Sequence, residues 1–121
     1  MASLRTKETA QKYRSDQLNK KWDPKSYSFD WEANNIELFK YWALIPTNYP
    51  YDLVAEIHHL LVPKRIYPSY REVSKEERAE LMDIKDILKG RYDFIIENLP
   101  SKITIGRHYH LHFIKMKGER V

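Results

Sequence analysis

Apolar and polar residues follow a pattern typical of β-strands in three segments of the chain. The first is residues 36–46, in which positions 39–45 are rich in aromatic and aliphatic side chains and a proline ends the run. The second is residues 54–63, which also ends at a proline, and the third is residues 108–117. Residues 46–52 contain two prolines, an asparagine and an aspartate, so they predict a turn between the first two strands.

The longest stretch of helical periodicity follows the second strand. Ser74 and Glu77 form the pattern of a capping box, in which each side chain bonds a backbone N–H at the start of a helix. Apolar residues then recur at the spacing of an amphipathic helix: Leu81, Ile84, Leu88, Tyr92, Ile95 and Leu99. We therefore predict one helix over residues 75–98, with Gly90 inside it at a cost of about 1 kcal/mol and Pro100 after its end.

The order of these elements is two strands, a long helix and a final strand, which predicts an α+β domain. Because the loops between consecutive strands are short, the sheet is expected to be mainly antiparallel, with the helix packed on one face. A chain of 121 residues suits one domain. We divide the chain into an N-terminal extension at residues 1–35 and a single domain at residues 36–121.

The N-terminal extension is basic, whereas the rest of the chain is balanced in charge. The net charge is +4, and residues 1–26 carry seven Lys and Arg against three acidic residues, while the other 95 residues carry 14 of each sign. A segment of this kind either contacts nucleic acid or another polyanion, or is a solvated extension that is partly helical or disordered. Composition leaves both interpretations open.

Composition also restricts the class of protein. There is no cysteine, so disulfides and thiolate metal sites are excluded. The first residues contain no apolar run typical of a secretory signal, and no window approaches the roughly 20 apolar residues that span a bilayer. We therefore expect a soluble, cytoplasmic protein without membrane contact.

All five histidines fall in two of the predicted strands, with His58 and His59 in one and the other three in the segment "HYHLHFI". Side chains of a strand alternate between its two faces. His108, His110 and His112 should therefore share one face, and the apolar residues between them should pack under the helix on the other. Of the neighbouring pair His58 and His59, only one can join the face of the triad.

Such a row of imidazoles is compatible with a metal site or with nucleophilic catalysis. Imidazoles at i and i+2 lie roughly 7 Å apart, so a zinc site would need two of the triad and a ligand from another strand, such as His58 or His59. Alternatively, a neutral imidazole can attack phosphorus and form a phosphohistidine. Neighbouring imidazoles can then hold its tautomer, donate to phosphate oxygens and protonate the leaving group.

The histidine segment resembles the signature of the histidine triad (HIT) superfamily, His-φ-His-φ-His-φ-φ, where φ is apolar. Residues 57–65, "IHHLLVPKR", resemble the family segment in which a histidine precedes Pro-Lys. Residues 45–52, "IPTNYPYD", are similar to the turn with asparagine and proline that comes before it. The resemblance covers residues 36–117 and implies a HIT-like sheet with one long helix.

The resemblance also implies an activity. It is that of a nucleotidyl hydrolase or transferase acting at the α-phosphate of a nucleotide derivative through a nucleotidyl-histidine intermediate. Carried over by position, His110 would be the nucleophile, and His112 would contact the phosphate and assist the leaving group. His108 would orient His110, and His58 would be the fourth histidine of the site. The resemblance implies no metal, no cofactor and a homodimer.

Four further positions are candidate substrate contacts. Asn48 would lie near the ribose or base, and Lys64 belongs to the Pro-Lys segment. Just before the triad the family commonly has Gly, then Gln or Asn, then Ser or Thr, which bind phosphate. In the same place this chain has Thr104 and Arg107, whose side chains could donate hydrogen bonds to a phosphate. Two alternatives therefore stay open. One is a catalytically weak or inactive module that binds a nucleotide or an RNA end, and the other is a histidine-ligated metal-binding domain.

Overall fold

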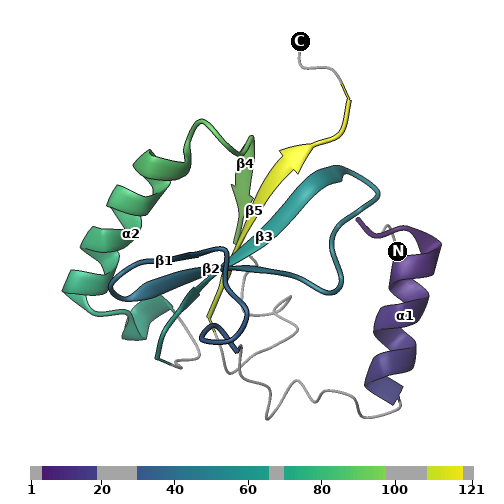
Figure 1. Ribbon diagram of the computed structural model, residues 1–121, viewed down its shortest axis with the longest axis horizontal. Coiled ribbons are helices and arrows are strands. Elements are labelled where there is room, and N and C mark those ends of the chain that lie inside the picture. Colours follow the sequence, from purple (N-terminus) through teal and green to yellow (C-terminus); the bar gives the residue numbers. More distant parts are fainter. Residues whose placement is uncertain (1–3, 19–29, 66–69, 98–108, 119–121) are drawn as a thin grey trace.

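The computed structural model describes residues 4–18, 30–65, 70–97 and 109–118, which form a five-stranded sheet and two α-helices (Figure 1). The elements in chain order are α1 (Lys7–Leu18), β1 (Glu37–Leu38), β2 (Trp42–Pro46), β3 (Ala55–Pro63), the short 3-10 helix η1 (Tyr70–Glu72), α2 (Lys75–Leu88), β4 (Phe94–Ile96) and β5 (Leu111–Met116). The strand order is β1-β2-β3-β5-β4, and every neighbouring pair is antiparallel. The predicted α+β class with an antiparallel sheet is confirmed.

The two helices occupy different places around the sheet. In Figure 1, α2 lies at one side of the molecule and α1 at the other, beside the connection between β2 and β3. Among the helices of the described segments, none has the length and apolar character needed to cross a membrane.

The main core lies between α2 and one face of the sheet. Alternate residues of β2, β3 and β5 point toward the helix, which contributes Leu81, Ile84 and Leu88. The strand and loop side chains buried in this cluster are Trp42, Leu44, Leu61, Val73, Tyr109, Leu111 and Phe113. The opposite face carries two smaller apolar clusters, one around Leu60 and one around Ile114.

The predicted helix over residues 75–98 is too long. α2 ends at Leu88, and the chain turns where the Arg91 N–H donates to the Leu88 carbonyl at 2.9 Å. The Asp93 N–H then donates to the Ile114 carbonyl at 2.7 Å, and the chain continues as β4 along β5. Pairing with β5 satisfies backbone N–H and C=O groups of this segment, so it forms a strand. The helical spacing of its apolar residues beyond Leu88 was therefore misleading.

The first predicted strand is interrupted. β1 ends at Leu38, a tight turn follows, and the Phe39 N–H donates to the Trp42 carbonyl at 2.9 Å before β2 returns along β1. The Glu80 carboxylate of α2 holds this turn, because it accepts from the backbone N–H groups of Lys40 and Tyr41 at 3.0 and 2.7 Å. The second predicted strand, over residues 54–63, agrees with β3. The third is confirmed as β5, and its predicted start lies outside the described residues.

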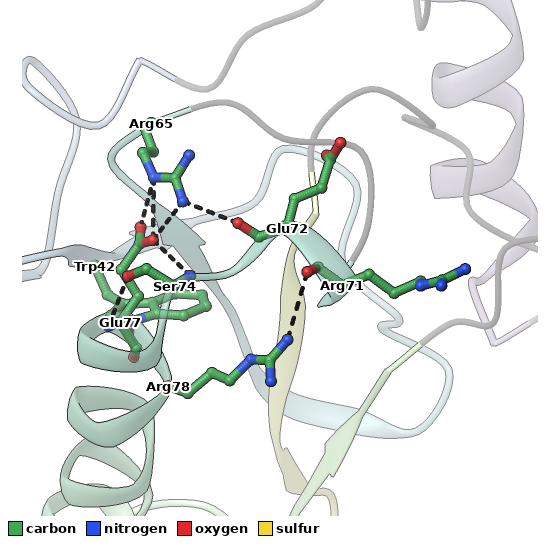
Figure 2. Close-up of polar contacts among 7 residues, drawn as sticks. All are labelled: Trp42, Arg65, Arg71, Glu72, Ser74, Glu77 and Arg78. Carbon is green, nitrogen blue, oxygen red and sulfur yellow. Dashed lines mark hydrogen bonds and ion pairs between the residues drawn. The ribbon is translucent and has the colours of Figure 1, made fainter.

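The start of α2 contains the predicted capping box (Figure 2). The Ser74 hydroxyl accepts from the Glu77 N–H at 3.1 Å, and the Glu77 carboxylate accepts from the Ser74 N–H at 3.0 Å. Arg65 also donates to this carboxylate, with its Nη2 at 2.7 Å. Burial alone raises the pKa of Glu77, but the hydrogen bonds from Arg65 and Ser74 outweigh it and hold the pKa below its usual value. The Glu77 carboxylate of the capping box is therefore ionised.

Candidate active site

Three histidines lie together on the sheet face opposite α2. His58 is in β3, His112 is in β5, and His110 directly precedes β5. His58 pairs with Ile114 and His112 with Leu60, so the two histidines are diagonal neighbours across the strands. All three are buried, since His58 and His112 are each 6% exposed and His110 is 9% exposed. The ring centroids of His110 and His112 are 5.0 Å apart. The shared face predicted for these two is confirmed.

A chain of hydrogen bonds fixes the tautomers of two imidazoles. The backbone N–H of Tyr51 donates to Nδ1 of His58 at 2.8 Å, and Nε2 of His58 lies 2.8 Å from Nδ1 of His112. Because an amide N–H can only donate, Nδ1 of His58 is an acceptor and a neutral His58 carries its proton on Nε2. That proton is donated to Nδ1 of His112, so a neutral His112 carries its own proton on Nε2. We call the Tyr51 amide, His58 and His112 the histidine relay.

Both imidazoles of the relay are neutral near pH 7. Burial lowers the pKa of His58 to about 4, and the positive charge of Arg5 acts in the same direction. Burial also lowers the pKa of His112 to about 2, with further contributions from the neighbouring imidazoles and from Arg5. A neutral ring has one donor and one acceptor nitrogen, which is the form that the relay requires.

Tyr51 contributes both its backbone and its ring to the site. The ring stacks on His112, with centroids 5.0 Å apart and planes at 21°, and its centroid is 4.5 Å from that of His58. Its carbonyl accepts from the N–H groups of Val54 and Ala55 at 3.1 and 2.8 Å, which closes the turn before β3. Sequence reasoning missed Tyr51. The available signal was its place in the predicted turn, but turn residues do not reveal which amide meets a histidine.

The N-terminal helix is attached to this same turn. The Asp52 carboxylate accepts from the Thr6 N–H at 2.8 Å and from the Thr6 hydroxyl at 3.1 Å, and the Thr9 hydroxyl also donates to it. Burial alone raises the pKa of Asp52, but the hydrogen bonds from Thr9 and Thr6 outweigh it and lower the pKa. Further along α1, Asp16 accepts from the Tyr49 hydroxyl at 2.8 Å. We call the contacts of Thr6 and Thr9 with Asp52 the N-terminal clasp. No residue pattern in the chain indicated these contacts.

Two predicted substrate contacts, Asn48 and Lys64, lie on either side of His58 along the chain. Asn48 is exposed in the turn between β2 and β3, three residues before Tyr51. Lys64 follows β3, six residues from His58, which is about 20 Å along an extended strand, and its ammonium lies 5.1 Å from the Trp31 ring centroid. Lys64 lines a hollow of about 420 Å³ near the start of α2. The structure therefore does not bring Lys64 to the histidines.

Three predicted site residues, His108, Thr104 and Arg107, lie outside the described residues. The remaining histidine, His59, faces α2, as strand alternation requires, and its Nδ1 lies 2.6 Å from the Tyr92 hydroxyl. His59 is therefore separated from the relay by the sheet.

Two of the described imidazoles, those of His58 and His112, are hydrogen-bonded to each other. Among the described residues, no group of three or more His, Asp or Glu side chains is placed to hold one metal ion. Nδ1 and Nε2 of His58 are both engaged in the relay, as is Nδ1 of His112. The geometry suits a chain of oriented N–H donors more directly than a set of converging ligands.

Comparisons with known proteins give limited information. No family model and no curated protein matches the chain. Among solved structures, the chain is similar to a histidine triad protein from Clostridium difficile, with a TM-score of 0.48 and 22% identity over 73% of this chain and 82% of that chain. At this TM-score and identity the similarity establishes no family, so the proposals below rest on the residues and contacts of this chain.

Proposed function

We propose that the protein is a nucleotidyl hydrolase or transferase that acts at the α-phosphate of a nucleotide derivative, with His110 as nucleophile. The histidine relay beside His110 carries this proposal. Burying polar rings costs free energy, and a packed sheet face is more stable with apolar side chains. Three buried imidazoles, two with assigned tautomers, therefore favour a chemical role over a structural one.

The proposed reaction has two displacements. A ring nitrogen of His110 attacks the α-phosphorus, the bond to the leaving group breaks, and the leaving group departs with the electron pair. Water or a second phosphate then attacks the phosphorus of the nucleotidyl-histidine, and the electron pair of the broken P–N bond returns to His110. When water is the attacker, the proton that it loses is released to the solvent. The net result is transfer of the nucleotidyl group.

The relay assigns different roles to His112 and His58. Nε2–H of His112 is the donor at the end of the relay, and in the proposal it binds a phosphate oxygen as negative charge develops. His58 acts through His112, so it is a positioning residue. The motif "HYHLHFI" and its resemblance to the HIT signature support a nucleotide as the substrate. His108 as the residue that orients His110, and Asn48, Thr104, Arg107 and Lys64 as substrate contacts, stay predictions.

A substrate panel tests the proposal. Release of nucleoside monophosphate is measured from nucleoside phosphoramidates, dinucleoside polyphosphates and nucleotide sugars, for the wild type, His110→Ala and His59→Ala. His59 is the matched control because it lies on the other face of the same strand pair. We expect His110→Ala to lower kcat at least about 1,000-fold and His59→Ala to change it less than about fivefold.

Covalent trapping gives a second readout. Acid-labile label from a nucleotide substrate should stay with the wild-type protein after rapid denaturation and should be absent from His110→Ala. Equal turnover by wild type and His110→Ala would contradict the proposal. Tight nucleotide binding without product from any substrate of the panel would instead favour a binding module.

A further inference from the structure

Residues of the N-terminal segment hold the turn between β2 and β3 on both sides of the Tyr51 amide. Before this amide, the Tyr49 carbonyl accepts from Nε of Arg5 at 2.9 Å. After it, the Leu53 N–H donates to the Leu4 carbonyl at 3.0 Å. The N-terminal clasp attaches the residue that directly follows Tyr51. The peptide group that sets the direction of the histidine relay is therefore held by residues more than 40 positions earlier in the chain.

Asp52 is the central residue of these contacts, because its carboxylate lies at the start of α1 (Figure 1). Thr6 caps this helix, since its hydroxyl accepts from the Thr9 N–H at 3.3 Å and its carbonyl from the Ala10 N–H at 2.9 Å. The Asp52 carboxylate accepts from the Thr6 N–H and from both threonine hydroxyls. Hydrogen bonds to a charged group are stronger than neutral ones, and a negative charge is favourable at a helix N-terminus. The carboxylate therefore joins α1 firmly to the turn.

The direction of the relay depends on where the Tyr51 amide points. While its N–H donates to Nδ1 of His58, the relay ends in the Nε2–H of His112. If the amide turned away, a neutral His58 could carry its proton on Nδ1, and its Nε2 would then accept from Nδ1–H of His112. Nε2 of His112 would be left without a hydrogen, so the relay would end in an acceptor instead of a donor.

We infer that Asp52 is a positioning residue of the site: the N-terminal clasp keeps the Tyr51 amide on His58 and so keeps the relay in the direction that presents the Nε2–H of His112. Asp52 acts through the turn and not on a substrate. The effect on turnover rests on the proposed function, whereas the direction of the relay does not. Residues 4–9 thus belong to the framework of the histidine site.

The test measures the state of the relay in full-length variants at pH 7. Asp52→Ala removes the carboxylate. Thr9→Val removes one hydroxyl of the clasp and keeps the shape of the side chain, and Thr9→Ser retains the hydroxyl. Ser74→Ala is the control for a general loss of stability, because the cap of α2 lies on the other side of the molecule from α1 (Figure 1).

Hydrogen exchange of the Tyr51 amide is the first readout. We expect exchange to be about 10- to 100-fold faster in Asp52→Ala than in the wild type, because the hydrogen bonds to a charged group that hold the turn are lost. Thr9→Val should show a smaller acceleration, while Thr9→Ser and Ser74→Ala should stay within about threefold of the wild type.

Long-range ¹H–¹⁵N spectra of the two relay imidazoles are the second readout. In Asp52→Ala the ring ¹⁵N shifts of His58 and His112 should move together, from those of the Nε2-protonated form toward those of the Nδ1-protonated form. They should move together because the hydrogen bond between the rings needs one donor and one acceptor. Thr9→Val should show the same change to a smaller extent, and Thr9→Ser should restore the wild-type shifts.

Three results would overturn the inference. The first is ring shifts in Asp52→Ala and Thr9→Val that equal those of the wild type, even if the Tyr51 amide exchanges faster, since the clasp would then hold the turn without positioning the relay. The second is the same change in Ser74→Ala. The third is equal behaviour of Thr9→Val and Thr9→Ser, which decides the matter if Asp52→Ala does not fold.

Turnover separates this inference from the proposed function. If the protein is a nucleotidyl hydrolase or transferase, kcat in Asp52→Ala should fall in proportion to the fraction of molecules with a reversed relay, and Ser74→Ala should keep the wild-type kcat. A reversed relay in a protein that turns over no substrate would support the role of Asp52 and contradict the proposed function. Wild-type ring shifts in an active Asp52→Ala enzyme would do the opposite.

Discussion

At the scale of single residues, one backbone amide determines the protonation pattern of the site. Tyr51 N–H can only donate, so the direction of the whole relay follows from it. If neutral His58 were the tautomer protonated at Nδ1, the Tyr51 amide and that nitrogen would be two donors facing each other. The orientation of His112 depends in turn on His58.

This pattern predicts a specific NMR result. At pH 7, His58 and His112 should both show the neutral tautomer protonated at Nε2 in long-range ¹H–¹⁵N spectra. Neither ring should titrate appreciably between pH 8 and pH 5, because burial lowers both pKa values well below 6.5. The urea-unfolded protein is the control, since its histidines should titrate near pH 6.5. An Nδ1-protonated His58, or a native pKa near 6.5 for either ring, would contradict the relay.

At the scale of elements, the two helices have different relations to the sequence. The start of α2 is encoded locally, because Ser74 and Glu77 are three residues apart and complete each other's hydrogen bonds. Its end is decided by β5, which pairs with the segment after Leu88. The place of α1 depends on Asp52, a residue more than 40 positions away in the chain.

The cap of α2 gives a prediction at this scale. Ser74→Ala should lower the free energy of unfolding by about 1 kcal/mol, because the Glu77 N–H loses its acceptor. Urea denaturation at pH 7 measures the change. Ser74→Asp is the matched control, since Asp is also a good N-cap residue and should stay close to the wild type. A similar loss of unfolding free energy in both variants would contradict the role of the Ser74 side chain as the N-cap.

At the scale of the whole molecule, the buried histidines make stability depend on pH. Between pH 6.5 and the lowered native pKa values, the unfolded chain binds protons at His58 and His112 that the native state does not. Stability contributed by these groups is therefore complete above pH 6.5 and is lost as the pH falls. His59, whose pKa is lowered by burial and by Arg91, adds in the same direction.

The expected loss is about 2–4 kcal/mol of unfolding free energy between pH 7 and pH 5, from at most about 1.4 kcal/mol per pH unit for each buried histidine. Urea denaturation at pH 7, 6 and 5 measures it. Asp52 and Glu77 have lowered pKa values and lose their contribution below this window. In His112→Gln the slope should fall by about half, whatever the stability of the variant at pH 7. A wild-type stability that is constant over this range would contradict neutral burial of the histidines.

The sequence by itself determined the features that depend on short-range periodicity. Alternation in a strand placed His110 and His112 on one face and Leu111 and Phe113 on the other, and the spacing of Ser74 and Glu77 located the start of α2. These features follow from backbone geometry over a few residues, so they can be read without knowing the neighbours in space.

The tertiary structure decided which distant segments meet. The register of β3 on β5 brings His58 to His112 across 54 positions of sequence. Residue patterns fix the faces of a strand but leave its register open, and register is set by pairing and packing over the whole sheet. The N-terminal clasp likewise depends on the shape of the turn that carries Tyr51 and Asp52. That turn joins the basic N-terminal segment, with Arg5, to the histidine site.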